Sequence, residues 1–147
     1  MDYNCNNHYC NYLLIKMKKI KISITGCLGR MGQQIIKSSE KNKAFKIVSL
    51  TENKAINKKI NGIKPDFNSF KSFKDADVII DFTIPKSTLE VLKIATKQKK
   101  RVVIGTTGFT KNQERLIKLY SRKIPILKAG NMSLGVNLLM YLTEIAS

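Results

Sequence analysis

The alternation of short apolar runs with helical stretches constrains this chain more than any other feature of its sequence. Apolar, β-branched runs are expected as strands at 20–25, 45–51, 78–82, 102–104 and 125–127. They are apolar runs rather than in–out alternations, most clearly at 78–82 and 102–104, as in strands buried on both faces. Helical periodicity over about ten residues follows most of them, whereas residues 52–74 are polar and hold turn signals. This order predicts an α/β fold with a Rossmann-like, doubly wound parallel sheet.

Within the helical stretches, the residues that begin a helix and those that face the sheet can also be predicted. Ser87, with Glu90 at the capping-box position, is expected to cap one helix, and Thr110 is expected to cap the next. The expected apolar faces comprise Met31, Ile35, Ile36, Leu89, Leu92, Ala95, Leu116, Leu119 and Tyr120. In the last helix, one apolar side is expected to hold Leu138, Leu139, Leu142 and Ile145.

The first expected strand runs directly into Gly26, Gly29 and Gly32, which form a G-x-x-G-x-x-G pattern. A strand that turns sharply into a helix needs glycine where the backbone approaches a pyrophosphate and where helix and strand pack closely. The helix N-terminus then offers N–H groups and the positive end of its dipole to the phosphates. Arg30 is expected to contact phosphate or ribose, or else to remain in solvent. The candidate phosphate-binding residues are Gly26, Cys27, Leu28, Gly29, Arg30 and Met31.

An acid at the end of the second expected strand, Glu52, follows Gly32 by 20 residues. In dinucleotide-binding folds an acid at this place accepts hydrogen bonds from the ribose hydroxyls of adenosine. Two alternatives stay open: Thr51 can occupy that position instead, and Glu52 can be an ordinary surface residue. Lys54 can pair with a 2′-phosphate, so the candidate cofactors are NADH and NADPH.

Two further loops are expected at the edge of the sheet where the carboxyl ends of parallel strands meet. Small residues there let a flat ring approach the backbone, while hydroxyl and amide groups orient it. The competing interpretations are a tight turn at the first loop and an ordinary helix cap at the second. The first loop holds Gly105, Thr106, Thr107 and Gly108, and the second holds Ala129, Gly130, Asn131, Met132 and Ser133.

The chain has 27 lysine and arginine residues against 10 aspartate and glutamate residues, a formal charge of +17. This excess first suggests nucleic acid or an acidic membrane surface. However, no basic helix, zinc finger or RNA-binding aromatic pattern accompanies it, and no apolar run approaches the roughly 18 residues of a membrane span. The lysines are spread along the sequence, and A/T-rich codons are the simpler cause. We therefore expect no nucleic-acid or membrane partner, although a positive field can favour an anionic dinucleotide.

Residues 1–16 differ from the rest of the chain, and we expect a disordered extension there, with translation from Met17 as an alternative. The segment lacks the basic start and the apolar stretch of about 7–15 residues that a secretory signal needs. Cys5, His8 and Cys10 are of zinc-ligand types, but a structural site needs four ligands, so no metal is expected. Three cysteines without a Cys-x-x-Cys pair fit a reducing cytoplasm.

Four motifs, in this order and spacing, carry a family resemblance. They read Gly26-Cys27-Leu28-Gly29-Arg30-Met31-Gly32, Val78-Ile79-Ile80-Asp81-Phe82-Thr83 followed by Pro85, Val103-Ile104-Gly105-Thr106-Thr107-Gly108-Phe109, and Gly130-Asn131-Met132-Ser133-Leu134-Gly135-Val136-Asn137. Together they resemble the amino-terminal half of the 4-hydroxy-tetrahydrodipicolinate reductase (dihydrodipicolinate reductase) family of lysine and diaminopimelate biosynthesis. The resemblance covers about residues 18–147.

The resemblance implies an oxidoreductase that passes a hydride from NAD(P)H to a cyclic dicarboxylate, usually as a homotetramer. It implies that residues 17–131 form the dinucleotide-binding domain, and that residues 132–147 form a linking helix to a substrate domain. The acid/base histidine of the family lies in that second domain, and the single histidine of this chain is His8. No catalytic residue is therefore expected here, and the chain alone is expected to be inactive. A free-standing dinucleotide-binding module is the alternative.

Overall fold

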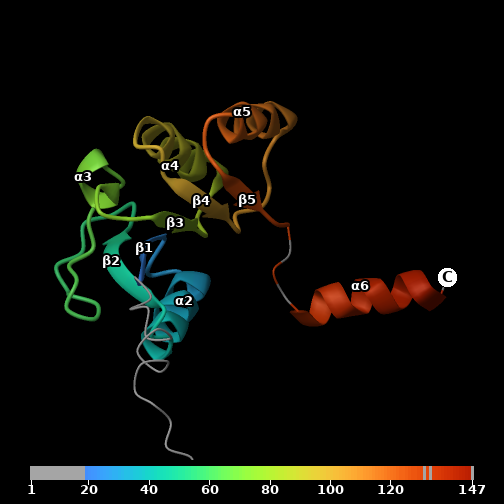
Figure 1. The fold of residues 1–147 in the computed structure, drawn as a ribbon, viewed down its shortest axis with the longest axis horizontal. Helices are drawn as coiled ribbons and strands as arrows, with labels where there is room; N and C mark the ends of the chain where they lie inside the picture. The colour runs from blue at the N-terminus through green and yellow to red at the C-terminus, as the bar shows by residue number, and fades with distance from the viewer. Residues whose placement is uncertain (1–18, 131, 133, 147) are drawn as a thin grey trace, which may run out of the picture.

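Five parallel strands form one sheet in the computed structural model, which describes residues 19–130, 132 and 134–146 (Figure 1). The strands are β1 (Ile20–Thr25), β2 (Phe45–Thr51), β3 (Val78–Asp81), β4 (Arg101–Ile104) and β5 (Ile126–Lys128). The helices are α2 (Arg30–Lys41), α3 (Phe70–Phe73), α4 (Pro85–Lys97), α5 (Lys111–Ser121) and α6 (Leu134–Ala146). Every predicted strand lies within one residue of its expected bounds, and the predicted α/β class is confirmed.

The strand order is β2-β1-β3-β4-β5, so the chain changes direction across the sheet after β2. It steps from β1 outward to β2, then crosses back and adds β3 on the other side of β1. In open α/β sheets, ligands bind beyond the carboxyl ends of the strands at such a reversal. The reversal sets the last residues of β1 and β3, Thr25 and Asp81, side by side in register.

Apolar residues cover both faces of the sheet, as predicted. Ile24 and Ile80 are in register on one face and pack in a cluster with Ile36 of α2. Ile79 and Val102 are in register on the other face, where the larger cluster also contains residues of α3, α4 and α5. Figure 1 shows α2 on one side of the sheet and α4 and α5 on the other. Burial on both faces explains the continuous apolar runs of β3 and β4, whereas β1 alternates between isoleucine and polar residues.

The helix starts are predicted with mixed success. Thr110 caps α5 as expected, because its hydroxyl accepts from the Gln113 N–H while the Gln113 side chain accepts from the Thr110 N–H. The prediction for α4 is wrong: the helix begins at Pro85 with Ile84 as its N-cap, and Ser87 lies inside the first turn. Proline suits this first position because its missing N–H needs no partner there and its φ angle is already helical.

The prediction for the apolar face of α5 is also wrong, because the buried residue is the one next to the predicted Leu116. Ile117 is the buried residue, at 5% exposure, whereas Leu116 and Leu119 are 43% and 51% exposed. Tyr120 packs against the core cluster as expected. Similarly, Met31 at the start of α2 is 47% exposed although it belongs to the predicted face. Helical periodicity shows that a helix has one apolar face, but it does not decide which of two adjacent apolar residues is buried against the sheet.

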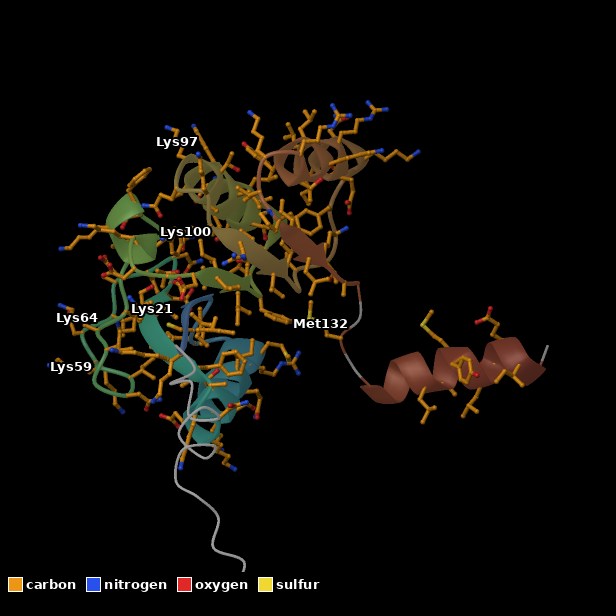
Figure 2. All side chains as sticks on the ribbon, viewed as in Figure 1. Lys21, Lys59, Lys64, Lys97, Lys100 and Met132 are labelled. Atoms are coloured by element: carbon orange, nitrogen blue, oxygen red, sulfur yellow. The ribbon has the colours of Figure 1, made fainter. Side chains whose placement is uncertain are left out.

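Cations gather at the edge of the sheet where the strands begin and the helices end, although they are spread along the sequence. Figure 2 shows Lys21, Lys97 and Lys100 on the opposite side of the molecule from Met132. The negative end of each helix dipole stabilises cations at this edge. Fewer cations, among them Arg30, Lys54, Lys86, Lys111 and Lys128, lie toward the carboxyl ends of the strands. This lysine edge comprises Lys19, Lys21, Lys41, Lys43, Lys46, Lys71, Lys74, Lys97, Lys99, Lys100, Arg101, Arg122 and Lys123.

Helix α6 extends away from the sheet (Figure 1). Six of its apolar side chains are more than half exposed: Leu138, Leu139, Met140, Tyr141, Leu142 and Ile145. Among the described residues, no helix has the length and apolarity that crossing a membrane would require.

Exposed apolar side chains at this density favour association, and we expect the chain to self-associate through α6. Light scattering over a range of concentrations should show a rising mass. The double variant Leu139→Glu with Leu142→Glu should shift the onset to at least tenfold higher concentration. The control Asn112→Glu with Ser121→Glu adds the same charge on α5 and should change little. A monomeric wild-type chain at high concentration would refute this.

Candidate functional site

A cleft with a volume of about 240 Å³ lies at the reversal of the sheet, and we call it the main cleft because Gly26 and Gly29 line it. A second cleft of about 340 Å³ continues from it, and the two share Glu52, Asn53, Asn68, Ile84 and Ser87. Together they form an elongated groove across the ends of β1, β2 and β3. The main cleft is also lined by Gly26, Gly29, Phe82 and Thr83, and the second cleft by Phe67, Lys86 and Glu90.

The glycine loop (residues 26–29) makes the turn from β1 into α2. Gly26 has a φ of +69°, which glycine adopts without strain. The N–H groups of Gly26 and Cys27 both donate to the Thr51 carbonyl, at 2.9 and 3.2 Å, and so tie the loop to the end of β2. Gly29 is the N-cap of α2 and has no side chain to cap its first N–H groups. This leaves the positive end of the helix open toward the cleft.

Two glycines are required by close packing. A Cβ atom at Gly32 would lie 2.2 Å from the Gly26 carbonyl oxygen and 2.9 Å from the Cys27 Cα atom. Gly32 therefore lets α2 approach the turn, as the glycine pattern predicts. A Cβ atom at Gly105 would lie 2.0 Å from the Phe82 ring, so Gly105 makes room for the aromatic side chain that lines the cleft.

Glu52 bridges the end of β2 and the glycine loop. Its Oε2 atom accepts from the Leu28 N–H at 3.1 Å, and its Oε1 atom accepts from the Asn53 N–H at 3.0 Å. Thr51, the alternative from the sequence, is fully buried and donates its hydroxyl to the Asn68 Oδ1 atom at 2.6 Å. Glu52 lines both clefts and Thr51 lines neither. A carboxylate held in this way can accept hydrogen bonds from a sugar diol.

The structure separates the other candidate residues of the glycine loop. Cys27 is buried in the core cluster on the α2 face. Burial, and secondarily the negative charge of Glu52, raise the pKa of its thiol to about 11. Its side chain is therefore a neutral thiol, and it lines neither cleft. Leu28, Arg30 and Met31 are exposed near the start of α2.

The loop after β4 is tied to the loop after β3. Thr106 is 3% exposed, and its hydroxyl accepts from the Thr83 N–H at 2.9 Å. Thr107, in contrast, is exposed. Ala129 donates its N–H to the Ile104 carbonyl at 3.3 Å. Gly130 and Met132 are exposed, none of these three lines either cleft, and Asn131 and Ser133 lie outside the described residues.

Sequence reasoning missed several residues that line the groove: Asn53, Asn68, Thr83, Ile84 and Ser87. It also missed a buried carboxylate, Asp81, which accepts hydrogen bonds from four threonine hydroxyls. A detectable signal existed for Asp81, because a charged residue that ends an apolar strand is rarely buried without partners. The described residues contain no cluster of side chains suited to a metal ion.

Comparison with known proteins agrees with this geometry. Residues 20–132 match the family described as "Dihydrodipicolinate reductase, N-terminus". The 4-hydroxy-tetrahydrodipicolinate reductase of Pelagibacter ubique (strain HTCC1062) is 71% identical over 131 residues, covering 89% of this chain and 51% of that protein. The reductase of the same name from Bdellovibrio bacteriovorus is 44% identical over 123 residues, covering 84% and 49%. The chain thus spans about half the length of the curated relatives it matches.

Solved structures point the same way. The dipicolinate-bound dihydrodipicolinate reductase from Paenisporosarcina sp. TG-14 superposes with a TM-score of 0.73 at 27% identity, covering 88% of this chain and 54% of that one. A homoserine dehydrogenase from S. aureus shares the fold, with a TM-score of 0.60 at 18% identity and coverage of 78% and 33%. The chain belongs to the dihydrodipicolinate reductase family and corresponds, over residues 20–132, to its amino-terminal region.

Proposed function

We propose that this chain binds NAD(P)H in the groove and serves as the cofactor-binding part of a 4-hydroxy-tetrahydrodipicolinate reductase. The observation that carries the proposal is the glycine loop at the reversal of the sheet, bridged to the end of β2 by the Glu52 carboxylate. In dinucleotide-binding folds a loop of this kind binds the pyrophosphate, and an acid at this place accepts hydrogen bonds from the ribose hydroxyls. The family membership supplies the reaction, the reduction of the cyclic dicarboxylate to tetrahydrodipicolinate in lysine and diaminopimelate biosynthesis.

The residues present fit a dinucleotide. Gly29 lines the main cleft and is exposed, so the absence of a side chain leaves space directly over the open end of α2. The pyrophosphate is proposed to lie there, close to Gly26 and Arg30. The adenosine ribose is proposed to contact Glu52, with the adenine in the second cleft between Phe67 and Ile84.

The nicotinamide is proposed to lie toward the ends of β3 and β4. Gly105, Thr106 and Thr107 are proposed to form one side of that region, and residues 129–132 are proposed to approach it from β5. When bound, the reduced nicotinamide supplies the hydride. The chain itself binds the cofactor, orients it and turns one face of the ring outward to a substrate. The full-length protein is proposed to be a cytoplasmic homotetramer, as the family resemblance implies.

Glu52 is proposed to favour NADH over NADPH, because a 2′-phosphate would place negative charge beside its carboxylate. Glu52→Gln removes that repulsion and should lower the ratio of the NADPH Kd to the NADH Kd by about tenfold, equivalent to about 1.4 kcal/mol. Glu40→Gln makes the same charge change at the far end of α2 and should leave the ratio unchanged. Both ratios can be measured by fluorescence titration. An unchanged ratio in Glu52→Gln would remove Glu52 from the ribose site.

A chimera tests the proposed reaction. Residues 1–147 of this chain would be fused to the carboxyl-terminal half of the Pelagibacter ubique reductase, with a Gly29→Asp version as the matched control. We expect the first chimera to oxidise NADH only when the cyclic substrate is present, and the control to be inactive. A folded chimera that binds NADH and reduces nothing would contradict the reductase assignment while leaving cofactor binding intact.

A further inference from the structure

We propose that Asp81 is a positioning residue: its buried carboxyl group holds the loops around the main cleft in the arrangement that binds NAD(P)H. This inference rests on the proposed cofactor function and adds to it a residue that does not line the cleft. Asp81 ends β3 and is fully buried. Asp81 is not among the candidate cofactor residues that the sequence predicted.

Four threonine hydroxyls donate to the Asp81 carboxyl group. Thr25 and Thr83 donate to Oδ1, at 2.5 and 2.8 Å. Thr88 and Thr106 donate to Oδ2, at 2.5 and 2.9 Å. An ionised carboxylate has about four acceptor sites, so the four hydroxyls use its hydrogen-bonding capacity in full.

The four threonines come from four different segments around the cleft. Thr25 directly precedes Gly26 and so anchors the glycine loop. Thr83 belongs to the loop after β3, and Thr106 belongs to the loop after β4. Thr88 lies in α4, which covers this face of the sheet. One carboxyl group therefore connects three loops that meet at the reversal of the sheet with the helix behind them.

Further hydrogen bonds join the loops after β3 and β4 to each other and to the backbone of Asp81. The Thr106 hydroxyl accepts from the Thr83 N–H while it donates to Asp81, so the two loops are joined directly as well. The Gly105 N–H donates to the backbone carbonyl of Asp81 at 2.8 Å. The loops on either side of the proposed nicotinamide region are thus fixed to one residue by both its side chain and its backbone.

A purely structural role would be served better by an apolar residue. Burying a carboxyl group in a core is unfavourable unless every acceptor site is filled, and replacing such a polar cluster by well-packed apolar side chains is often neutral or stabilising. On this face Asp81 is bordered by two apolar residues, Ile79 in its own strand and Ile104 in β4, and by Thr25 of β1, which is in register with it. The polar cluster stands only at the end of the strands, where the loops leave the sheet.

Thr25→Val and Thr106→Val test the proposal, with Thr88→Val as the matched control. All three remove one hydroxyl from the same carboxyl group, but Thr88 holds a helix instead of a loop. Thr25 is fully buried and lines neither cleft, so its replacement removes no cofactor contact, and Thr25→Val decides the affinity test. Thr106 belongs to the proposed nicotinamide region, so Thr106→Val is decided by hydrogen exchange without cofactor. We expect NADH affinity to fall at least tenfold in Thr25→Val and Thr106→Val, and less than about threefold in Thr88→Val. Thr25→Ser and Thr106→Ser should restore it.

Amide hydrogen exchange without cofactor separates this proposal from the proposed function. Thr106→Val should speed exchange at Gly105, and Thr25→Val should speed it at Gly26, whereas Thr88→Val should leave both slow. The Thr83 amide is not used for Thr106→Val, because its N–H donates directly to the Thr106 hydroxyl. If wild-type chain fails to bind NADH, the proposed function fails, and the exchange pattern still decides whether Asp81 holds the loops. Equal exchange and equal NADH affinity in the three valine variants, in step with their melting temperatures, would overturn the proposal.

Discussion

Gly29→Asp should abolish NADH binding and leave the fold intact. Gly29 lines the main cleft at the N-cap of α2, where an aspartate side chain would project toward the proposed pyrophosphate. Two like charges about 4 Å apart at an effective dielectric constant near 20 repel by about 4 kcal/mol. Solvent at this exposed position reduces that energy, so a loss of at least about 100-fold in affinity is expected. Aspartate is also a favourable N-cap residue, so the melting temperature should hold.

Gly29→Asn is the control for the charge. Asparagine has nearly the same size and caps helices equally well, so it should weaken NADH binding by its volume alone and by clearly less than aspartate does. Titration calorimetry gives both affinities, and circular dichroism confirms the fold. If Gly29→Asp binds NADH as tightly as wild type, the phosphate does not lie at the glycine loop.

Gly32→Ala should destabilise the domain by about 2–4 kcal/mol, the upper range for an overpacked site. The new Cβ atom would lie 2.2 Å from the Gly26 carbonyl oxygen. This neighbour is backbone, so either the glycine loop or the start of α2 must move. Within a helix, alanine is otherwise more favourable than glycine by about 1 kcal/mol. A net loss of stability in Gly32→Ala would therefore be due to the clash.

Urea unfolding measures this effect. Gly130→Ala is a suitable control because a Cβ atom there meets nothing within 4 Å, and its free energy of unfolding should change by less than about 0.5 kcal/mol. A Gly32→Ala chain as stable as wild type would show that α2 is free to move away from the turn. Its affinity for NADH would then report whether the close approach matters for the cofactor.

The strands and the fold class could be predicted because their signals are local. Ile20–Thr25 and Phe45–Thr51 are found at the expected bounds, two other strands differ by one residue at one end, and β5 is shifted by one residue. The glycine loop was also predictable, since the turn needs the positive φ angle of Gly26 and the close approach of α2 needs Gly32. Helix faces were harder: Ile117 instead of Leu116 is the buried residue of α5, because the direction in which a short amphipathic helix packs depends on its neighbours in space.

The site could be predicted only in part, because its other components meet through tertiary structure. No sequence pattern indicates that Thr25, Thr88 and Thr106 contact Asp81. They lie 56, 7 and 25 residues from it along the chain. The register of β1 against β3 brings the first pair together. In the same way, the lysine edge appears only when five strand starts align, since its members are dispersed in the sequence. Long-range register, rather than local preference, decides both features.

Amide chemical-shift mapping of the intact chain during a titration with NADH tests the central claim most directly. We predict saturable shifts at residues 26–31, at Glu52 and Asn53, and at residues 83–84 and 105–107, with no change along the lysine edge. An absence of saturable shifts, or saturable shifts at Lys97, Lys99 and Arg101 instead, would contradict the claim that the groove at the reversal of the sheet is the cofactor site.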